Sequence, residues 1–186
     1  GYSSSRFSSL ELINKNNIKN LKVAWIYNSK DGKKGIQANP IVYDGYVYFP
    51  TPGNFIVCVD GATGKEIWRF KSKSKFPAQR GLIYWEGSKK SKPGIYFSDQ
   101  LGLYKLNISD GTLIKEFGDN GFIKTNLSKT APVIIDDNLI ISTFAPSIDF
   151  IDLHNGKIKW KFFLKKKNNG FYVNSNSRLG GCNPWG

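Results

Sequence analysis

The chain has 186 residues, of which 40% are hydrophobic, 15% aromatic and 22% charged, a balance that excludes a disordered protein. It contains no run of 18 apolar residues, which excludes a membrane-spanning helix of ordinary length. The formal net charge of +13 would suit a nucleic-acid-binding surface. The lysines are scattered, however, and the densest run, Lys165 to Lys167, is followed by Asn168-Asn169-Gly170 and is typical of a solvated turn, so we expect no nucleic-acid partner.

The two ends of the chain carry no recognisable targeting signal. The sequence begins at Gly1 without a methionine, shows no signal peptide and ends at Gly186 within a turn-like stretch. We therefore expect the chain to be a piece of a longer protein. Its two cysteines, Cys58 and Cys182, lie far apart and lack metal-site spacing, which leaves open whether they form a disulfide.

The first predicted element is a β-hairpin. Residues 10–21 have some helical spacing but carry several asparagines, so no helix longer than two turns is expected along the chain. Further on, Ile41-Val42-Tyr43 and Tyr46-Val47-Tyr48-Phe49 are β-rich runs that flank Asp44-Gly45. An Asp-Gly pair between two such runs is typical of a two-residue hairpin turn.

Two further strands follow the hairpin. A third strand is expected at residues 56–59 and a fourth at 66–70. They are separated by Asp60-Gly61-Ala62-Thr63-Gly64, a turn in which the aspartate can accept hydrogen bonds from backbone N–H groups and the last glycine can adopt positive φ.

This pattern recurs with a period of about 46 residues. Trp68 follows Gly64 by four residues, and Trp160 follows Gly156 by four residues in the third copy of the turn. A second copy ends at Gly111, where Lys115 takes the place of the tryptophan. Four short strands in each repeat are typical of the blades of a β-propeller.

We therefore predict an all-β protein with four-stranded antiparallel propeller blades. The chain would form an incomplete arc of about three blades plus the start of a fourth, within one domain over residues 1–186. Trp68 and Trp160 are expected to pack between neighbouring blades rather than against a ligand. The predicted segments are an opening segment at 1–35, blades at about 36–70, 80–118 and 130–163, and the start of the next blade at 170–186.

Several motifs, in this order and spacing, resemble the alcohol and sugar dehydrogenases that depend on pyrroloquinoline quinone (PQQ). The motifs are Arg6-Phe7-Ser8 with Leu12-Ile13-Asn14, Leu21 to Trp25, Gln37-Ala38-Asn39-Pro40 with Thr51-Pro52, Arg80-Gly81-Leu82-Ile83-Tyr84-Trp85, Phe117-Gly118-Asp119-Asn120-Gly121, and Gly180-Gly181-Cys182-Asn183-Pro184-Trp185-Gly186. The resemblance covers nearly the whole chain and implies the N-terminal part of an eight-bladed propeller.

The resemblance also implies residues that bind the cofactor. PQQ is a planar quinone with three carboxylates, and a guanidinium such as that of Arg80 can bind a carboxylate through two charge-assisted hydrogen bonds. Trp185 matches the tryptophan on which the cofactor stacks. Further polar contacts are expected from Gln37, Thr130, Thr143 and Asn183. Judged from the residues alone, Arg80 could also be a surface arginine and Trp185 a core tryptophan.

The implied activity is oxidation of an alcohol or sugar hydroxyl, with electrons passed to a cytochrome or a membrane quinone, in the periplasm. The catalytic aspartate and most Ca²⁺ ligands are expected downstream, so we expect no catalytic or metal-binding residue and no turnover from this chain alone. His154 lies in an expected turn and is not a credible base. Membrane attachment stays open.

One departure and one alternative bear on this interpretation. Methanol-oxidising members carry two adjacent cysteines where this chain has Ser74-Lys75, which favours a sugar- or other-alcohol-type relative. The alternative is a non-catalytic propeller that serves as a protein-interaction scaffold. Such a protein would keep the repeated tryptophans but would not need Arg80-Gly81 or residues 180–186.

Overall fold

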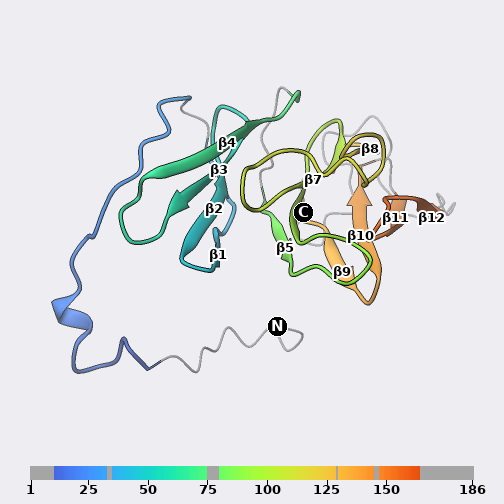
Figure 1. Ribbon diagram of the computed structural model, residues 1–186. Coiled ribbons are helices and arrows are strands. Elements are labelled where there is room, and N and C mark those ends of the chain that lie inside the picture. Colours follow the sequence, from blue (N-terminus) through green and yellow to red (C-terminus); the bar gives the residue numbers. More distant parts are fainter. Residues whose placement is uncertain (1–10, 33–34, 75–79, 129, 145–146, 164–186) are drawn as a thin grey trace, which may run out of the picture.

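The computed structural model describes residues 11–32, 35–74, 80–128, 130–144 and 147–163. The predicted start of the next blade, with Asn183 and Trp185, lies outside these residues. Within them are three antiparallel four-stranded sheets (Figure 1). The first sheet contains β1 (Ile41–Tyr43), β2 (Tyr46–Pro50), β3 (Phe55–Asp60) and β4 (Glu66–Lys71). The second contains β5 (Ile83–Trp85), β6 (Gly94–Ser98), β7 (Gly102–Leu106) and β8 (Phe122–Lys124). The third contains β9 (Val133–Ile135), β10 (Asn138–Thr143), β11 (Ser147–Asp152) and β12 (Ile158–Phe163).

The first hairpin forms as its turn residues predict. Asp44 and Gly45 both have positive φ, 49° and 78°, the backbone conformation of a type I′ turn. The turn sets the register of β1 on β2, in which Tyr43 faces Tyr46. The helical content of the described residues is limited to the short 3-10 helix η1 (Ile18–Asn20), as expected from the asparagine-rich sequence.

The second sheet extends further along the chain than the repeat predicted. The repeat placed the end of this blade near residue 118, whereas its last strand, β8, runs from Phe122 to Lys124. The residues before β8 form successive turns, in which Phe117 N–H donates to Ile114 O and Gly121 N–H donates to Phe117 O. The sequence lacks the repeated tryptophan here, and the chain folds back on itself before it pairs with β7.

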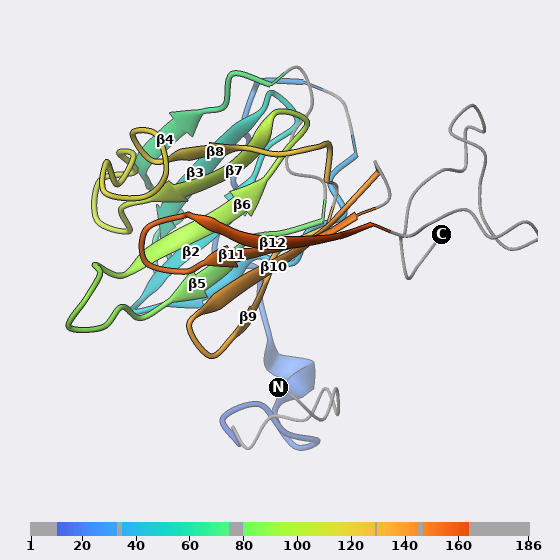
Figure 2. The same ribbon diagram turned by 90° about the vertical axis from the view of Figure 1, so that its right-hand side faces the viewer.

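The second sheet lies between the other two, and a hydrophobic core fills each junction (Figures 1 and 2). Alternate residues of β6 and β7 face opposite sides, as strand geometry requires. Ile95 and Phe97 pack toward the first sheet, whereas Tyr96 and Leu103 pack toward the third. Burial on both faces explains why every residue of β6 and β7 is buried.

The indole of Trp68 links the first sheet to the second. Trp68 is buried on β4, and its Nε1–H donates to Ile108 O at 3.0 Å across the junction. A Cβ at Gly111, where φ is +71°, would lie 2.4 Å from the Trp68 ring, so only glycine fits against the indole. The predicted packing of Trp68 between blades is therefore confirmed.

The N-terminal segment repeats this contact on the other face of the first sheet. Trp25 Nε1–H donates to Gly61 O at 2.9 Å, and Gly64 is packed against the indole ring. Figure 1 shows the segment after η1 running beside the first sheet. Trp160, by contrast, is 48% exposed and stacks on Phe150 on the outer face of the third sheet, so its inter-blade role stays a prediction.

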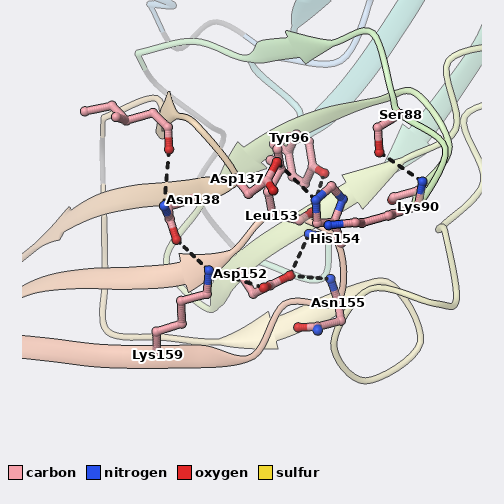
Figure 3. Close-up of polar contacts among 12 residues, drawn as sticks. Ser88, Lys90, Tyr96, Asp137, Asn138, Asp152, Leu153, His154, Asn155 and Lys159 are labelled. Carbon is pink, nitrogen blue, oxygen red and sulfur yellow. Dashed lines mark hydrogen bonds and ion pairs between the residues drawn. The ribbon is translucent and has the colours of Figure 1, made fainter.

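A tyrosine replaces the tryptophan at the junction of the second and third sheets. Tyr96, on β6, donates its hydroxyl to Leu153 O at 2.8 Å (Figure 3). Leu153 follows Asp152 in the third copy of the turn, as Gly61 follows Asp60 in the first. In all three contacts the acceptor is the carbonyl of the second residue of the turn. The donor differs at the junction of the second and third sheets, where it lies on the second strand of its sheet.

Candidate functional site

The described part of the predicted cofactor site lies at one end of the blades. Gln37, Arg80 and Thr130 each precede the first strand of their sheet by a few residues. Thr143 ends β10, which runs antiparallel to β9, so it lies at the same end of the third sheet as Thr130. Asn183 and Trp185 lie outside the described residues.

Arg80 and Thr130 lie side by side although 50 positions separate them in the sequence. Their backbones form a parallel β-bridge between the second and third sheets. Ser98 Oγ donates to Thr130 O at 2.7 Å, which fixes the chain on the Thr130 side of the bridge. Gly81, with φ of +120°, turns the backbone next to Arg80. The structure thus brings together two of the residues that the sequence predicted.

Arg80 is half-buried, and within the described residues no carboxylate lies within ion-pair distance of its guanidinium. A half-buried cation of this kind is suited to an external anion. Gln37 is exposed and makes no hydrogen bond with Arg80 or Thr130 in the described part of the chain.

The Thr130 hydroxyl has only long contacts. Its Oγ1 lies 3.3 Å from Ser142 Oγ and 3.4 Å from Ser128 Oγ. Strong O–H···O hydrogen bonds have separations of about 2.5–3.0 Å. The hydroxyl can therefore turn to a better acceptor without losing a strong bond.

Thr143 is in the opposite situation. It is 2% exposed, and its Oγ1 lies 2.8 Å from Ser147 Oγ. Ser147 donates its own proton to Asp149 Oδ1 at 2.7 Å, so the Thr143 hydroxyl must donate to Ser147. Asp149 is fully buried and accepts from Lys161 Nζ at 2.8 Å. The Thr143 proton is thus directed into the sheet.

Sequence reasoning missed this polar network and a second buried carboxylate at the same end. Asp99 accepts hydrogen bonds from Ser72 and from the backbone N–H groups of Leu101 and Gly102. Burial raises the pKa of the Asp99 carboxyl, and these hydrogen bonds oppose the rise. For the Thr143 network, the one available sequence signal was that Ser147 and Asp149 are two residues apart in an expected strand, which places both side chains on one face of β11.

The sequence did not support His154 as a base. It lies in the β11–β12 turn, at the end of the third sheet opposite to Thr130 and therefore far from Arg80. Its Nε2 lies 3.2 Å from Asp137 Oδ1 (Figure 3). Its ring makes a T-shaped contact with Trp85. In the described residues no group of three or more His, Cys, Asp or Glu side chains could hold a metal ion. No helix among them is long and apolar enough to cross a membrane.

Comparison with known proteins identifies the family. Residues 1–129 match the family model of the PQQ-type glucose/ethanol/alcohol dehydrogenase β-propeller domain. The chain belongs to this family. The predicted resemblance and the all-β propeller of four-stranded antiparallel blades are therefore confirmed.

Two curated members of the PQQ dehydrogenase family illustrate the similarity. The dehydrogenase subunit of alcohol dehydrogenase (quinone) from Gluconacetobacter polyoxogenes is 30% identical, over 87% of this chain and 24% of that protein. Subunit 1 of methanol dehydrogenase [cytochrome c] from Methylorubrum extorquens is 29% identical, over 87% of this chain and 29% of that protein. The chain thus spans about a quarter of the length of such relatives.

Solved structures agree on the fold. Quinohemoprotein alcohol dehydrogenase ADHIIG from Pseudomonas putida HK5 superposes with a TM-score of 0.71 at 22% identity, over 87% of this chain and 25% of that one. The quinohemoprotein alcohol dehydrogenase from Comamonas testosteroni gives a TM-score of 0.68 at 24% identity, over 87% of this chain and 26% of that one.

Proposed function

We propose that this chain forms part of the PQQ-binding wall of a dehydrogenase that oxidises an alcohol or sugar hydroxyl. The observation that supports the proposal is the backbone bridge between Arg80 and Thr130. The guanidinium of Arg80 has no carboxylate partner among the described residues, and the Thr130 hydroxyl has only long contacts. A flat cofactor with three carboxylates requires donors of these kinds.

The residues have separable roles in this proposal. Arg80 binds a cofactor carboxylate through two N–H donors, and the Thr130 hydroxyl donates a further hydrogen bond. Ser98 holds the backbone of Thr130 in place. Thr143, whose proton is directed to Ser147, stabilises the strand end rather than donating to the cofactor. When bound, PQQ would supply the redox chemistry as the acceptor of a hydride from the carbon that bears the substrate hydroxyl, while the hydroxyl proton would go to the catalytic base.

Other parts of the predicted site are proposals of the same kind. Gln37, Asn183 and Trp185 are proposed as further cofactor contacts, with Trp185 as the stacking face. We propose that the catalytic base and the Ca²⁺ ligands belong to a further part of the protein. Relatives named alcohol dehydrogenase (quinone) and methanol dehydrogenase [cytochrome c] support an alcohol substrate and a cytochrome or quinone acceptor, and we propose a periplasmic location.

PQQ binding to the full chain, measured by equilibrium dialysis, tests the proposal. Arg80→Lys keeps the charge but loses the planar fork, so we expect PQQ binding at least about tenfold weaker than in the wild type. Arg69→Lys is the matched control, because Arg69 pairs with Glu66 on β4 and should leave PQQ binding unchanged. Equal binding by wild type and Arg80→Lys would remove Arg80 from the site. A wild-type chain without PQQ binding would favour the scaffold alternative.

A further inference from the structure

A cavity of about 800 Å³ lies between the second and third sheets, at the end of the blades opposite Arg80. Its volume falls in the range of small-molecule sites. It is formed by the β5–β6 loop, by Ile114 and Glu116, and by His154 and Asn155 of the β11–β12 turn. Figure 3 shows Ser88 and Lys90 of the loop near His154 and Asn155.

The β5–β6 loop gives the cavity a defined wall. Ser88 N–H donates to Ser91 O at 2.9 Å, and Lys90 N–H donates to Ser88 Oγ at 3.1 Å. Gly87, with φ of +88°, lets the loop turn against Pro93. These bonds hold the loop in one conformation.

The charges around the cavity are mainly positive. Lys89, Lys90 and Lys92 line it, against the carboxylates of Glu86 and Glu116. Lys92 Nζ lies 3.7 Å from Glu116 Oε1, an exposed and therefore weak ion pair. The rim alone would not define a site, because solvated lysines are common on protein surfaces.

A fully buried cation lies behind this wall. The Lys105 side chain has no solvent exposure, and its Nζ donates to Ser91 Oγ at 2.6 Å. The same ammonium lies 4.9 Å from the ring centre of Trp85 and 5.2 Å from that of Tyr96. Within the described residues it has no carboxylate within ion-pair distance. Burial lowers the pKa of Lys105 to about 8, and the Glu116 charge opposes this shift.

The contact with Ser91 links the buried ammonium to the cavity. Ser91 Oγ accepts from Lys105, so its own proton is free to donate, and Ser91 lines the cavity. A buried ammonium without a carboxylate at ion-pair distance destabilises a fold. A negatively charged ligand beside Ser91 would add a counter-charge to that of Glu116, which lies beyond ion-pair distance of Lys105.

We propose that this cavity binds a small oxyanion, a phosphate or a carboxylate, through the Ser91 hydroxyl with the Lys105 ammonium behind it. The lysines of the β5–β6 loop attract the ligand to the cavity. The site lies at the opposite end of the blades from Arg80 and Thr130 and does not depend on the proposed PQQ function.

The test uses the full chain with inorganic phosphate and with succinate, each compared with chloride at equal ionic strength. The readout is the unfolding temperature as a function of anion concentration, because a ligand that binds only the folded state raises it. We expect a saturable rise with at least one probe. A rise with phosphate alone identifies a phosphate site, and a rise with succinate alone identifies a carboxylate site.

Two variants and one control decide whether the cavity is responsible. Lys105→Met keeps the length of the side chain and should abolish the rise, and Ser91→Ala, which keeps the ammonium, should weaken the apparent affinity about tenfold. Lys65→Met removes an exposed lysine in the turn between β3 and β4 and should keep the full rise. The proposal fails if wild type responds to neither probe beyond chloride, or if both Lys105→Met and Ser91→Ala respond as wild type does.

Discussion

Lys105 combines full burial with a positive charge that has no described carboxylate partner. Its pKa of about 8 in the folded chain lies below the ordinary value of 10.5. Below pH 8 the lysine is charged in both folded and unfolded states, and the folded state carries the full desolvation cost. Between pH 8 and 10.5 the folded state loses the proton first, so this cost falls as pH rises.

We therefore expect Lys105→Met to be more stable than wild type at pH 7 in the absence of a multivalent anion. The expected gain is about 3 kcal/mol, the free energy equivalent of the pKa shift from 10.5 to about 8. The gain should shrink as the pH is raised from 8 toward 10. Urea unfolding of both proteins across this range measures the difference. A Lys105→Met protein that is less stable at pH 7 would show that the aromatic rings and Ser91 compensate the charge.

Tyr96 allows a second residue-scale prediction. Its hydroxyl is the donor to the buried carbonyl of Leu153, so Tyr96→Phe leaves that oxygen without this partner. We expect a loss of about 1–3 kcal/mol in the free energy of unfolding, measured with urea. Tyr46→Phe is the control, because Tyr46 is 36% exposed and its substitution should change stability little. Equal stability of Tyr96→Phe and wild type would mean that the bond contributes nothing net.

At the residue scale, the sequence predicted the residues that belong to the repeat or to a recognised motif, and it missed contacts made by residues outside them. Trp68 could be assigned to a blade junction because Gly64 precedes it by a spacing that recurs at Trp160. Tyr96 could not be assigned to a junction, because it makes the equivalent hydrogen bond from the second strand of its sheet and not from the fourth. Likewise Arg80 was found from its motif, whereas Ser98 is a single serine in a buried strand with no pattern to mark it.

At the scale of elements, the turns after the third strand of a sheet decide how neighbouring blades meet. Gly111 has positive φ, and a Cβ at this position would lie 2.4 Å from the Trp68 ring. Gly111→Ala introduces both backbone strain and a clash with the indole, so we expect a loss of about 2–4 kcal/mol in stability. Gly35→Ala is a suitable control, because nothing lies within 4 Å of a Cβ at that position. Thermal unfolding monitored by tryptophan fluorescence distinguishes the two variants, and a neutral Gly111→Ala would contradict the close packing.

The strands themselves were predictable because strand length, turn residues and period all agree. The exception is the stretch before β8, where the tryptophan of the repeat is absent and the chain makes successive turns. The course of the opening segment was also not predictable. Its contact with the first sheet depends on Trp25 and on the Tyr27 hydroxyl, which donates to Glu66, and these residues are far from their partners in sequence.

For the whole molecule, the position of a blade in the arc should set the cost of removing its tryptophan. Trp68 is 8% exposed between two sheets, whereas Trp160 is 48% exposed on the outer face of the third. In the full chain we expect Trp68→Ala to cost about 3–5 kcal/mol and Trp160→Ala less than about 1 kcal/mol, measured by urea unfolding. Equal losses would show that another part of the protein covers the Trp160 face in solution.

The side-chain hydrogen bonds at the junctions all have the same direction along the chain. At each junction the donor, on Trp25, Trp68 or Tyr96, precedes its carbonyl acceptor in the sequence. Each junction therefore joins a donor of one module to a carbonyl in the turn after the third strand of the next module. Duplication or loss of a whole module in a gene would preserve this head-to-tail complementarity, whereas a breakpoint inside a module would leave a carbonyl or an indole without its counterpart.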